Sequence, residues 1–246
     1  MNNKLLVIAR KDISEAFRSR STYIVILVMI LLSFVYISNY NNYVKGLGNK
    51  QLIIDYSRSF LNSLAYVLPA MFSTYVCSIF ANYAVVVDKA KRNLESLMAS
   101  PVSIKQIWLG KSLAVTLPSL GVGLAIAIIS FLVMDIGFVA PKAGGLVIPD
   151  PLAFVSTFIL VPILVFGIVT IVTYIQLVVT NPRIGNFVFS GIFILLFFGI
   201  NALGGFGVSI RYFSLVYLGL IILCAVVSYI LSLSLTKEKV LLSSKV

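Results

Sequence analysis

The chain has 246 residues, of which 60% are hydrophobic and only 11% are charged, and its mean hydropathy is +1.06. Soluble domains carry roughly a quarter charged residues, so this composition excludes an ordinary water-soluble domain and predicts one membrane-embedded domain over residues 1–246. The chain has no histidine, which excludes His-based acid–base catalysis and His-containing zinc sites.

The N-terminal segment 4–20 has the pattern of an amphipathic helix that lies on the membrane surface. Its apolar face consists of Leu5, Leu6, Ala9, Ile13, Ala16 and Phe17. The opposite face carries Lys11, Ser14, Glu15 and Arg18. This division between an apolar and a charged face is typical of interfacial helices. A basic flank that only orients the first span is the alternative interpretation.

Six uncharged stretches follow, and each is longer than the roughly 20 residues that a helix needs to cross the hydrocarbon core. Strict alternation of apolar and polar residues is absent, and backbone groups in lipid must bond within their own segment. We therefore expect helices and an all-α fold class. The expected spans are 22–38, 63–87, 112–134, 152–179, 187–202 and 212–235, with an irregular external loop at 135–151 and a short basic tail after the last span.

The basic residues orient these spans. With the N-terminus in the cytoplasm, 14 of the 19 Lys and Arg residues fall in cytoplasmic segments. The external residues are Lys45, Lys50, Arg58, Lys142 and Arg211. By the positive-inside rule, both termini of this multi-pass protein are expected in the cytoplasm, with the spans in the cell membrane. We interpret the net charge of +11 as a sign of topology and expect no nucleic-acid partner.

The cytoplasmic segment 88–111 is expected to form two short amphipathic helices. The apolar face of the first consists of Leu94, Leu97 and Met98. Asn93 can cap this helix, Glu95 suits its first turn, and Pro101 ends it. Ser103 can cap the second helix, whose apolar face consists of Ile104, Ile107 and Trp108. On physical grounds alone, an ordinary juxtamembrane loop explains this pattern equally well.

Segment 88–111 also resembles the signature of type-2 ATP-binding-cassette exporter permeases. The matching positions are Asp88, Leu94-Glu95, Leu97-Met98, Ser100-Pro101-Val102-Ser103 and Gly110-Lys111. Two features depart from the family pattern: Ala90 stands where a second acidic residue is usual, and Arg92-Asn93 replaces Gly-Thr. The N-terminal helix resembles the family's elbow helix, and the plan of six spans with both ends inside also matches.

This resemblance implies a permease subunit that forms a homodimer or heterodimer and works with a separate cytoplasmic ATPase. ATP and magnesium would bind to the ATPase, and this chain would hold no cofactor or metal and catalyse no reaction. The chain indeed lacks a Gly-x-x-x-x-Gly-Lys-Ser/Thr phosphate loop. The helix after the second span would be the coupling helix, and it would contact the ATPase through Leu94, Glu95, Leu97, Met98 and Pro101.

Uncharged polar residues recur in the spans. Asn82, Gln176 and Asn201 are candidates for lining a substrate path, and helix packing is the alternative role. Two other classes of protein are weaker matches. An ion-coupled secondary transporter usually needs acidic groups within the membrane, and a lipid-modifying enzyme needs a nucleophile–base pair. The resemblance leaves lipid-linked sugars, drugs, peptides and sodium open as substrates, and the apolar spans favour an amphipathic or apolar cargo.

Overall fold

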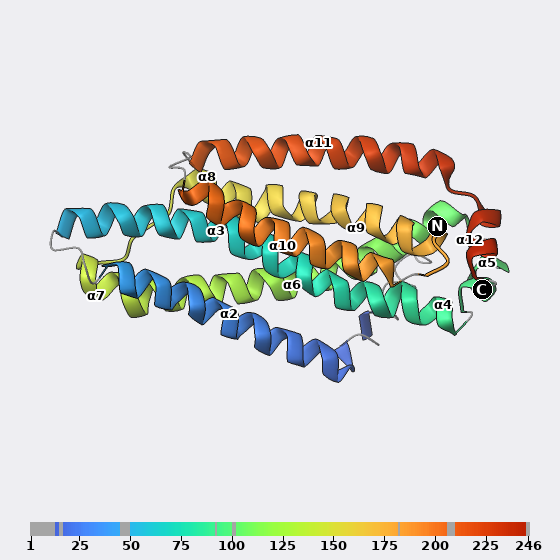
Figure 1. The fold of residues 1–246 in the computed structure, drawn as a ribbon, viewed down its shortest axis with the longest axis horizontal. Coiled ribbons are helices and arrows are strands. Elements are labelled where there is room, and N and C mark those ends of the chain that lie inside the picture. The colour runs from blue at the N-terminus through green and yellow to red at the C-terminus, as the bar shows by residue number, and fades with distance from the viewer. Residues whose placement is uncertain are drawn as a thin grey trace.

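The computed structural model describes residues 13–14, 17–44, 50–91, 93–99, 102–181, 183–205 and 210–244. All regular structure within these ranges is helical, as Figure 1 shows. The predicted all-α class is therefore confirmed for the described part of the chain. The predicted elbow helix at 4–20 lies mostly outside it.

Six long helices make up most of the structure. They are α2 (Arg20–Val44), α3 (Lys50–Ala81), α6 (Ile104–Met134), α9 (Val161–Val178), α10 (Ile184–Gly205) and α11 (Ile210–Ser234). The short helices are α4 (Asp88–Ala90), α5 (Asn93–Ala99), α7 (Ala140–Ala143), α8 (Pro151–Val155) and α12 (Lys237–Ser244). The π-helical segments η1 (Asn82–Val87), η2 (Asp135–Val139) and η3 (Ser156–Leu160) join α3 to α4, α6 to α7 and α8 to α9. Each inserts a wider turn into a rod that stays helical throughout.

In the part of the chain that the structure describes, five helical rods are long and apolar enough to cross a membrane. They are Thr22–Asn42, Lys50–Ala90, Ile104–Ala143, Pro151–Val178 and Tyr212–Ser234. Five of the six predicted spans lie in these rods. The remaining one, 187–202, lies in α10, where the structure describes side chains only as far as Leu195. This span therefore stays a prediction.

Two rods extend further than the apolar stretches predict. The loop expected at 135–151 is helical as far as Ala143, and α3 begins thirteen positions before the predicted start at 63. Tertiary contacts explain the extension. The Oη of Tyr40 lies 2.6 Å from the Oγ of Ser57, which joins α2 to α3. The Asp135 carboxylate accepts a hydrogen bond of 3.2 Å from the backbone N–H of Val147. Such contacts stabilise polar helix ends that hydropathy does not reveal.

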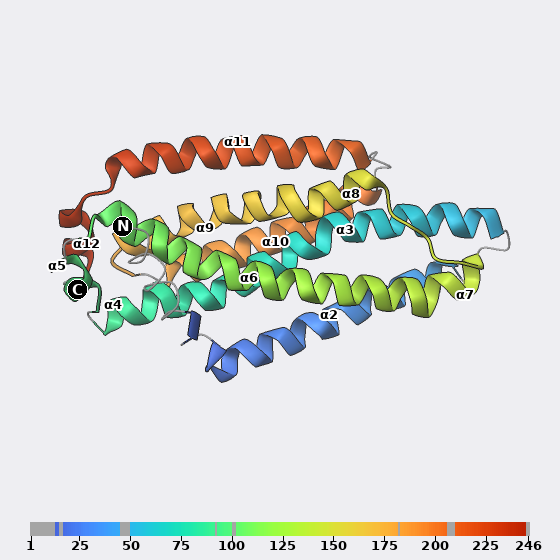
Figure 2. The same cartoon turned by 180° about the vertical axis from the view of Figure 1, so that it is seen from behind.

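The helices form an elongated bundle. Helices α4, α5 and α12 gather at one end, and α7 lies at the other with the start of α3 (Figure 1). We call these the α5 end and the α7 end. The α3 rod is 78% buried over its most apolar stretch, against 20% for the α2 rod and 17% for the α11 rod. The last two run along opposite edges of the bundle in Figures 1 and 2, so their outer faces are available to lipid or a partner.

The core has two parts. The first begins at the α5 end and continues along α9, where α3, α5, α11, α12 and the start of α6 pack around buried residues that include Phe80, Leu94, Ile107, Val169 and Val240. Towards the α7 end, α2, α3, α7 and the rest of α6 pack around Met29, Tyr40, Leu61, Met71 and Met134. Gly123 brings α6 close to α3, because a Cβ there would lie 2.6 Å from the backbone nitrogen of Ser73.

Candidate functional site

A buried ion pair holds the segment between α3 and α6 in place. The Nζ of Lys111 lies 2.6 Å from the Oδ2 of Asp88, and the two side chains are 0% and 2% exposed. The other carboxylate oxygen, Oδ1, accepts a hydrogen bond of 3.0 Å from the Asn93 amide on α5. Lys111 also donates to the carbonyl of Ala84 in η1. The pair therefore ties η1, α4, α5 and α6 together.

A second cation joins the same segment to the end of α9. The Nζ of Lys89 donates to the carbonyls of Leu177 at 3.3 Å and Val179 at 2.6 Å, and to the Oγ of Ser243 at 2.9 Å. Ser243 itself donates to the carbonyl of Leu177 at 2.8 Å. The last carbonyls of a helix have no partner within it, and a cation there also suits the helix dipole. Lys89 and Ser243 thus cap α9 and attach α4 and α12 to it.

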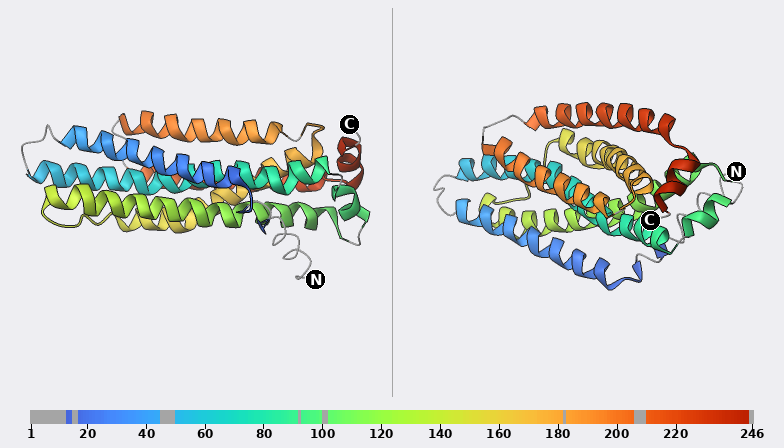
Figure 3. Two further views of the ribbon diagram at one scale, coloured as in Figure 1. Left: turned by 90° about the horizontal axis from the view of Figure 1, so that it is seen from below. Right: turned by 45° about the vertical axis from the view of Figure 1, so that its right-hand side comes forward.

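Helix α5 lies across the end of the bundle at which α4 and α12 also gather, as Figures 1 and 3 show. Leu94 and Met98 are 1% and 6% exposed and belong to the core of this chain. Helix α12 contacts α5 through a hydrogen bond of 3.1 Å from the Nζ of Lys237 to the carbonyl of Met98. The expected basic tail is therefore helical over Lys237–Ser244 and packs against α5.

Three apolar side chains on one face of a cytoplasmic helix would need a partner or lipid only if the chain left them uncovered. The chain itself covers Leu94 and Met98. Glu95 and Leu97 are half-buried, Ser96 is exposed, and Pro101 lies outside the described residues. The exposed side of α5 therefore carries Ser96 and Ala99, beside the half-buried Glu95 and Leu97.

The start of α6 is built as the sequence predicts. Ser103 caps it, with 3.3 Å from the Gln106 backbone nitrogen to the Ser103 Oγ and 3.1 Å from the Ser103 nitrogen to the Gln106 Oε1. The predicted apolar face, including Trp108, is buried. The Trp108 indole N–H donates a 2.8 Å hydrogen bond to the carbonyl of Thr170. This contact joins α6 to α9 beside segment 88–111.

The three predicted path-lining residues have different positions. Asn82 is half-buried at the start of η1 and lines a small polar pocket with Arg183, Asn186 and Ser190. Gln176 is fully buried, and its Nε2 lies 3.5 Å from the Oδ1 of Asn186. The Asn201 side chain lies outside the described residues. The structure thus brings Gln176 close to the Asn82 pocket through Asn186, and it shows no continuous path through the described part of the chain.

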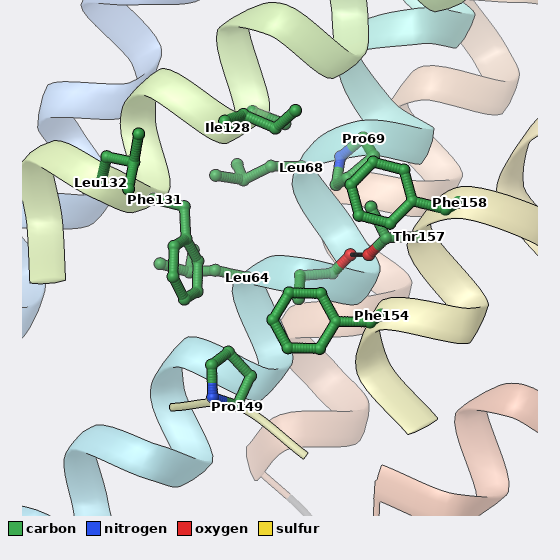
Figure 4. A pocket seen from close by; sticks show the side chains of 12 residues that line it. Leu64, Leu68, Pro69, Ile128, Phe131, Leu132, Pro149, Phe154, Thr157 and Phe158 are labelled. Atoms are coloured by element: carbon green, nitrogen blue, oxygen red, sulfur yellow. Dashed lines mark hydrogen bonds between the residues drawn. The ribbon is translucent and has the colours of Figure 1, made fainter. Parts of the chain in front are cut away.

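A larger groove lies between α3, α6 and the α8–η3 segment, and Figure 4 shows its lining. Its volume is about 290 Å³. Leu68, Pro69, Phe131, Phe154 and Phe158 are among the side chains around it. The Thr157 hydroxyl donates to the carbonyl of Ala65 at 2.6 Å, so the groove presents carbon surface. It can hold an alkyl chain or a comparable apolar group, but it has no polar group to orient one.

No group of three or more His, Cys, Asp or Glu residues that could hold a metal ion occurs in the ranges described. Comparisons with protein-family models, with curated proteins and with solved structures found no match to this chain.

Proposed function

We propose that this chain is the transmembrane permease subunit of an ATP-driven exporter and that α5 is the helix through which a separate ATPase acts on it. The observation that supports this most is the set of contacts that hold α5 in the bundle. A short helix follows the second span, lies across one end of the bundle and is hydrogen-bonded to α4 and α12.

These contacts suit a helix that transmits force to the rest of the bundle. The Asp88–Lys111 pair, at 2.6 Å, connects α4 and α6, and the hydrogen bond from Asn93 to Asp88 joins α5 to this pair. The Lys237–Met98 contact connects α5 to α12. Packed elements with fixed contacts move together, so a push on α5 would displace α6 and, through α12 and Lys89, α9. A loop held only at its two ends would absorb the push.

The charges support a cytoplasmic location for the α5 end. In the part of the chain that the structure describes, the basic residues at this end are Arg18, Arg20, Lys89, Lys91, Lys105, Lys111, Arg183, Lys237 and Lys239. Those at the α7 end are Lys50, Arg58, Lys142 and Arg211. Cytoplasmic segments carry the excess of basic residues, so the ATPase would approach α5 from the cytoplasm.

The proposal includes a second permease subunit, with α2 at the centre of the dimer. The outer face of α2 is apolar, and Ile24, Leu27 and Leu31 are each more than half exposed. We expect the variant Leu31→Cys to form a disulfide-linked dimer in native membranes. Leu223→Cys on α11, where the side chain is similarly exposed, is the control and should stay monomeric. A monomeric, transport-competent Leu31→Cys protein would exclude this arrangement.

The proposal is tested by purifying the chain from native membranes in mild detergent. A phosphate-loop ATPase should co-purify, and transport in reconstituted vesicles should require both that subunit and ATP. Leu97→Asp should abolish co-purification, because it removes roughly 1.5–3 kcal/mol of apolar contact and buries a charge. Glu95→Lys should act in the same direction. The control Leu146→Asp changes a residue that is 65% exposed near the α7 end and should retain the ATPase. Full recruitment by both α5 variants would contradict the proposal.

A further inference from the structure

A polar pocket opens at the α5 end between the start of α10 and η1. It has a volume of about 260 Å³ and is lined by Asn82, Arg183, Asn186, Phe187 and Ser190. We call it the Arg183 pocket. It lies on the side of α3 and η1 that faces α10, apart from the contacts that hold α5.

The Arg183 pocket is cationic. None of the acidic residues that the structure describes lines it. Within the described ranges, the Arg183 guanidinium and the Asn82 amide make no hydrogen bond or ion pair. Asn186 is oriented by Gln176, and Ser190 donates to the carbonyl of Asn186 at 3.0 Å. A guanidinium beside an amide donor is suited to an anion that accepts two or more hydrogen bonds, such as a phosphate group.

The surroundings of the pocket favour a lipid as the source of that phosphate. Phe187 borders the pocket and is 77% exposed. Ile194 is seven residues further along α10, on the same helical face, and is 53% exposed. An acyl chain can lie along this face while its phosphate enters the pocket. Basic pockets between membrane helices bind anionic headgroups in this way.

We propose that the Arg183 pocket binds the phosphate group of an anionic phospholipid, with one acyl chain of that lipid lying along α10. The site is separate from α5, so the lipid is a bound component of the permease and not a contact of the ATPase. The inference would hold even if the chain had no ATPase partner.

Binding is measured by native mass spectrometry of the full-length protein after removal of endogenous lipid in detergent. Phosphatidylglycerol and phosphatidylcholine are added separately, and inorganic phosphate is added as a competitor. Arg183→Gln should weaken phosphatidylglycerol binding by about tenfold to a hundredfold. Lys105→Gln removes an exposed basic residue from the same end and should weaken it by no more than about fivefold. Asn82→Leu leaves the Arg183 charge in place but removes the amide donor, and it should also weaken phosphatidylglycerol binding.

Tight retention of phosphatidylglycerol that Arg183→Gln removes and Lys105→Gln preserves would support the site. Displacement of the lipid by millimolar inorganic phosphate would show an anion site that does not select lipid and would overturn the proposal. Equal losses in Arg183→Gln and Lys105→Gln would overturn it as well, since they would indicate general attraction to a basic surface. Arg183→Lys, which keeps the charge but not the fork of donors, should recover part of the affinity.

Discussion

The Asp88–Lys111 pair offers the sharpest test of the contacts that hold the α4–α5 segment against α6. In Asp88→Ala, the Lys111 ammonium would keep a fully buried position without its carboxylate 2.6 Å away. Removing one partner of a buried ion pair costs about 3–5 kcal/mol, because the remaining charge is left uncompensated. We therefore expect the free energy of unfolding to fall by about that amount.

Denaturant unfolding of the purified protein in detergent micelles measures this change. The control Asp55→Ala removes an exposed carboxylate on α3 and should change stability by no more than about 0.5 kcal/mol. The double variant Asp88→Ala/Lys111→Met should be less damaging than the sum of the two single variants, because it leaves no unpaired charge. A loss below about 1 kcal/mol in Asp88→Ala, or strict additivity in the double variant, would refute the reasoning.

Two further predictions concern the packing of the bundle and its orientation. Gly123→Ala should cost about 1–3 kcal/mol, because the new Cβ would meet the backbone of α3, whereas Gly121→Ala faces open space and should be tolerated. The same unfolding measurement checks both, and equal tolerance would exclude the close approach of α3 and α6. A cysteine introduced at Lys105 should react with a membrane-impermeant reagent only in inverted vesicles. A cysteine at Gly145 should react only from outside intact cells, and the opposite result would reverse the topology.

Hydropathy predicted most of the fold. Five spans follow from uncharged stretches alone, because a helix in lipid needs length and apolar composition and little else. The capping of α6 by Ser103 was also predictable, because a capping box depends on residues only three positions apart. The helical continuation of α6 through η2 and α7 was not predictable from hydropathy. Contacts such as that of the Asp135 carboxylate with the Val147 N–H join segments that hydropathy treats separately.

The candidate site was predicted less completely. The sequence identified Asp88 and Lys111 as positions of the resemblance, but not as partners. Their contact depends on how α4 packs against α6, and charge alone does not select one pairing among many. The role of α12 was missed. Its signal was present in Val240 and Leu241, a pair of apolar residues beside the basic residues of the tail, and Val240 is fully buried.

Photocrosslinking in native membranes tests most directly whether α5 contacts a separate ATPase. A photoreactive amino acid at Ser96, on the exposed side of α5, should form a covalent adduct with a phosphate-loop ATPase. The same amino acid at Leu146, near the α7 end, should form none with that protein. Adducts at Ser96 with lipid alone would contradict the claim and leave α5 as a structural element of the bundle.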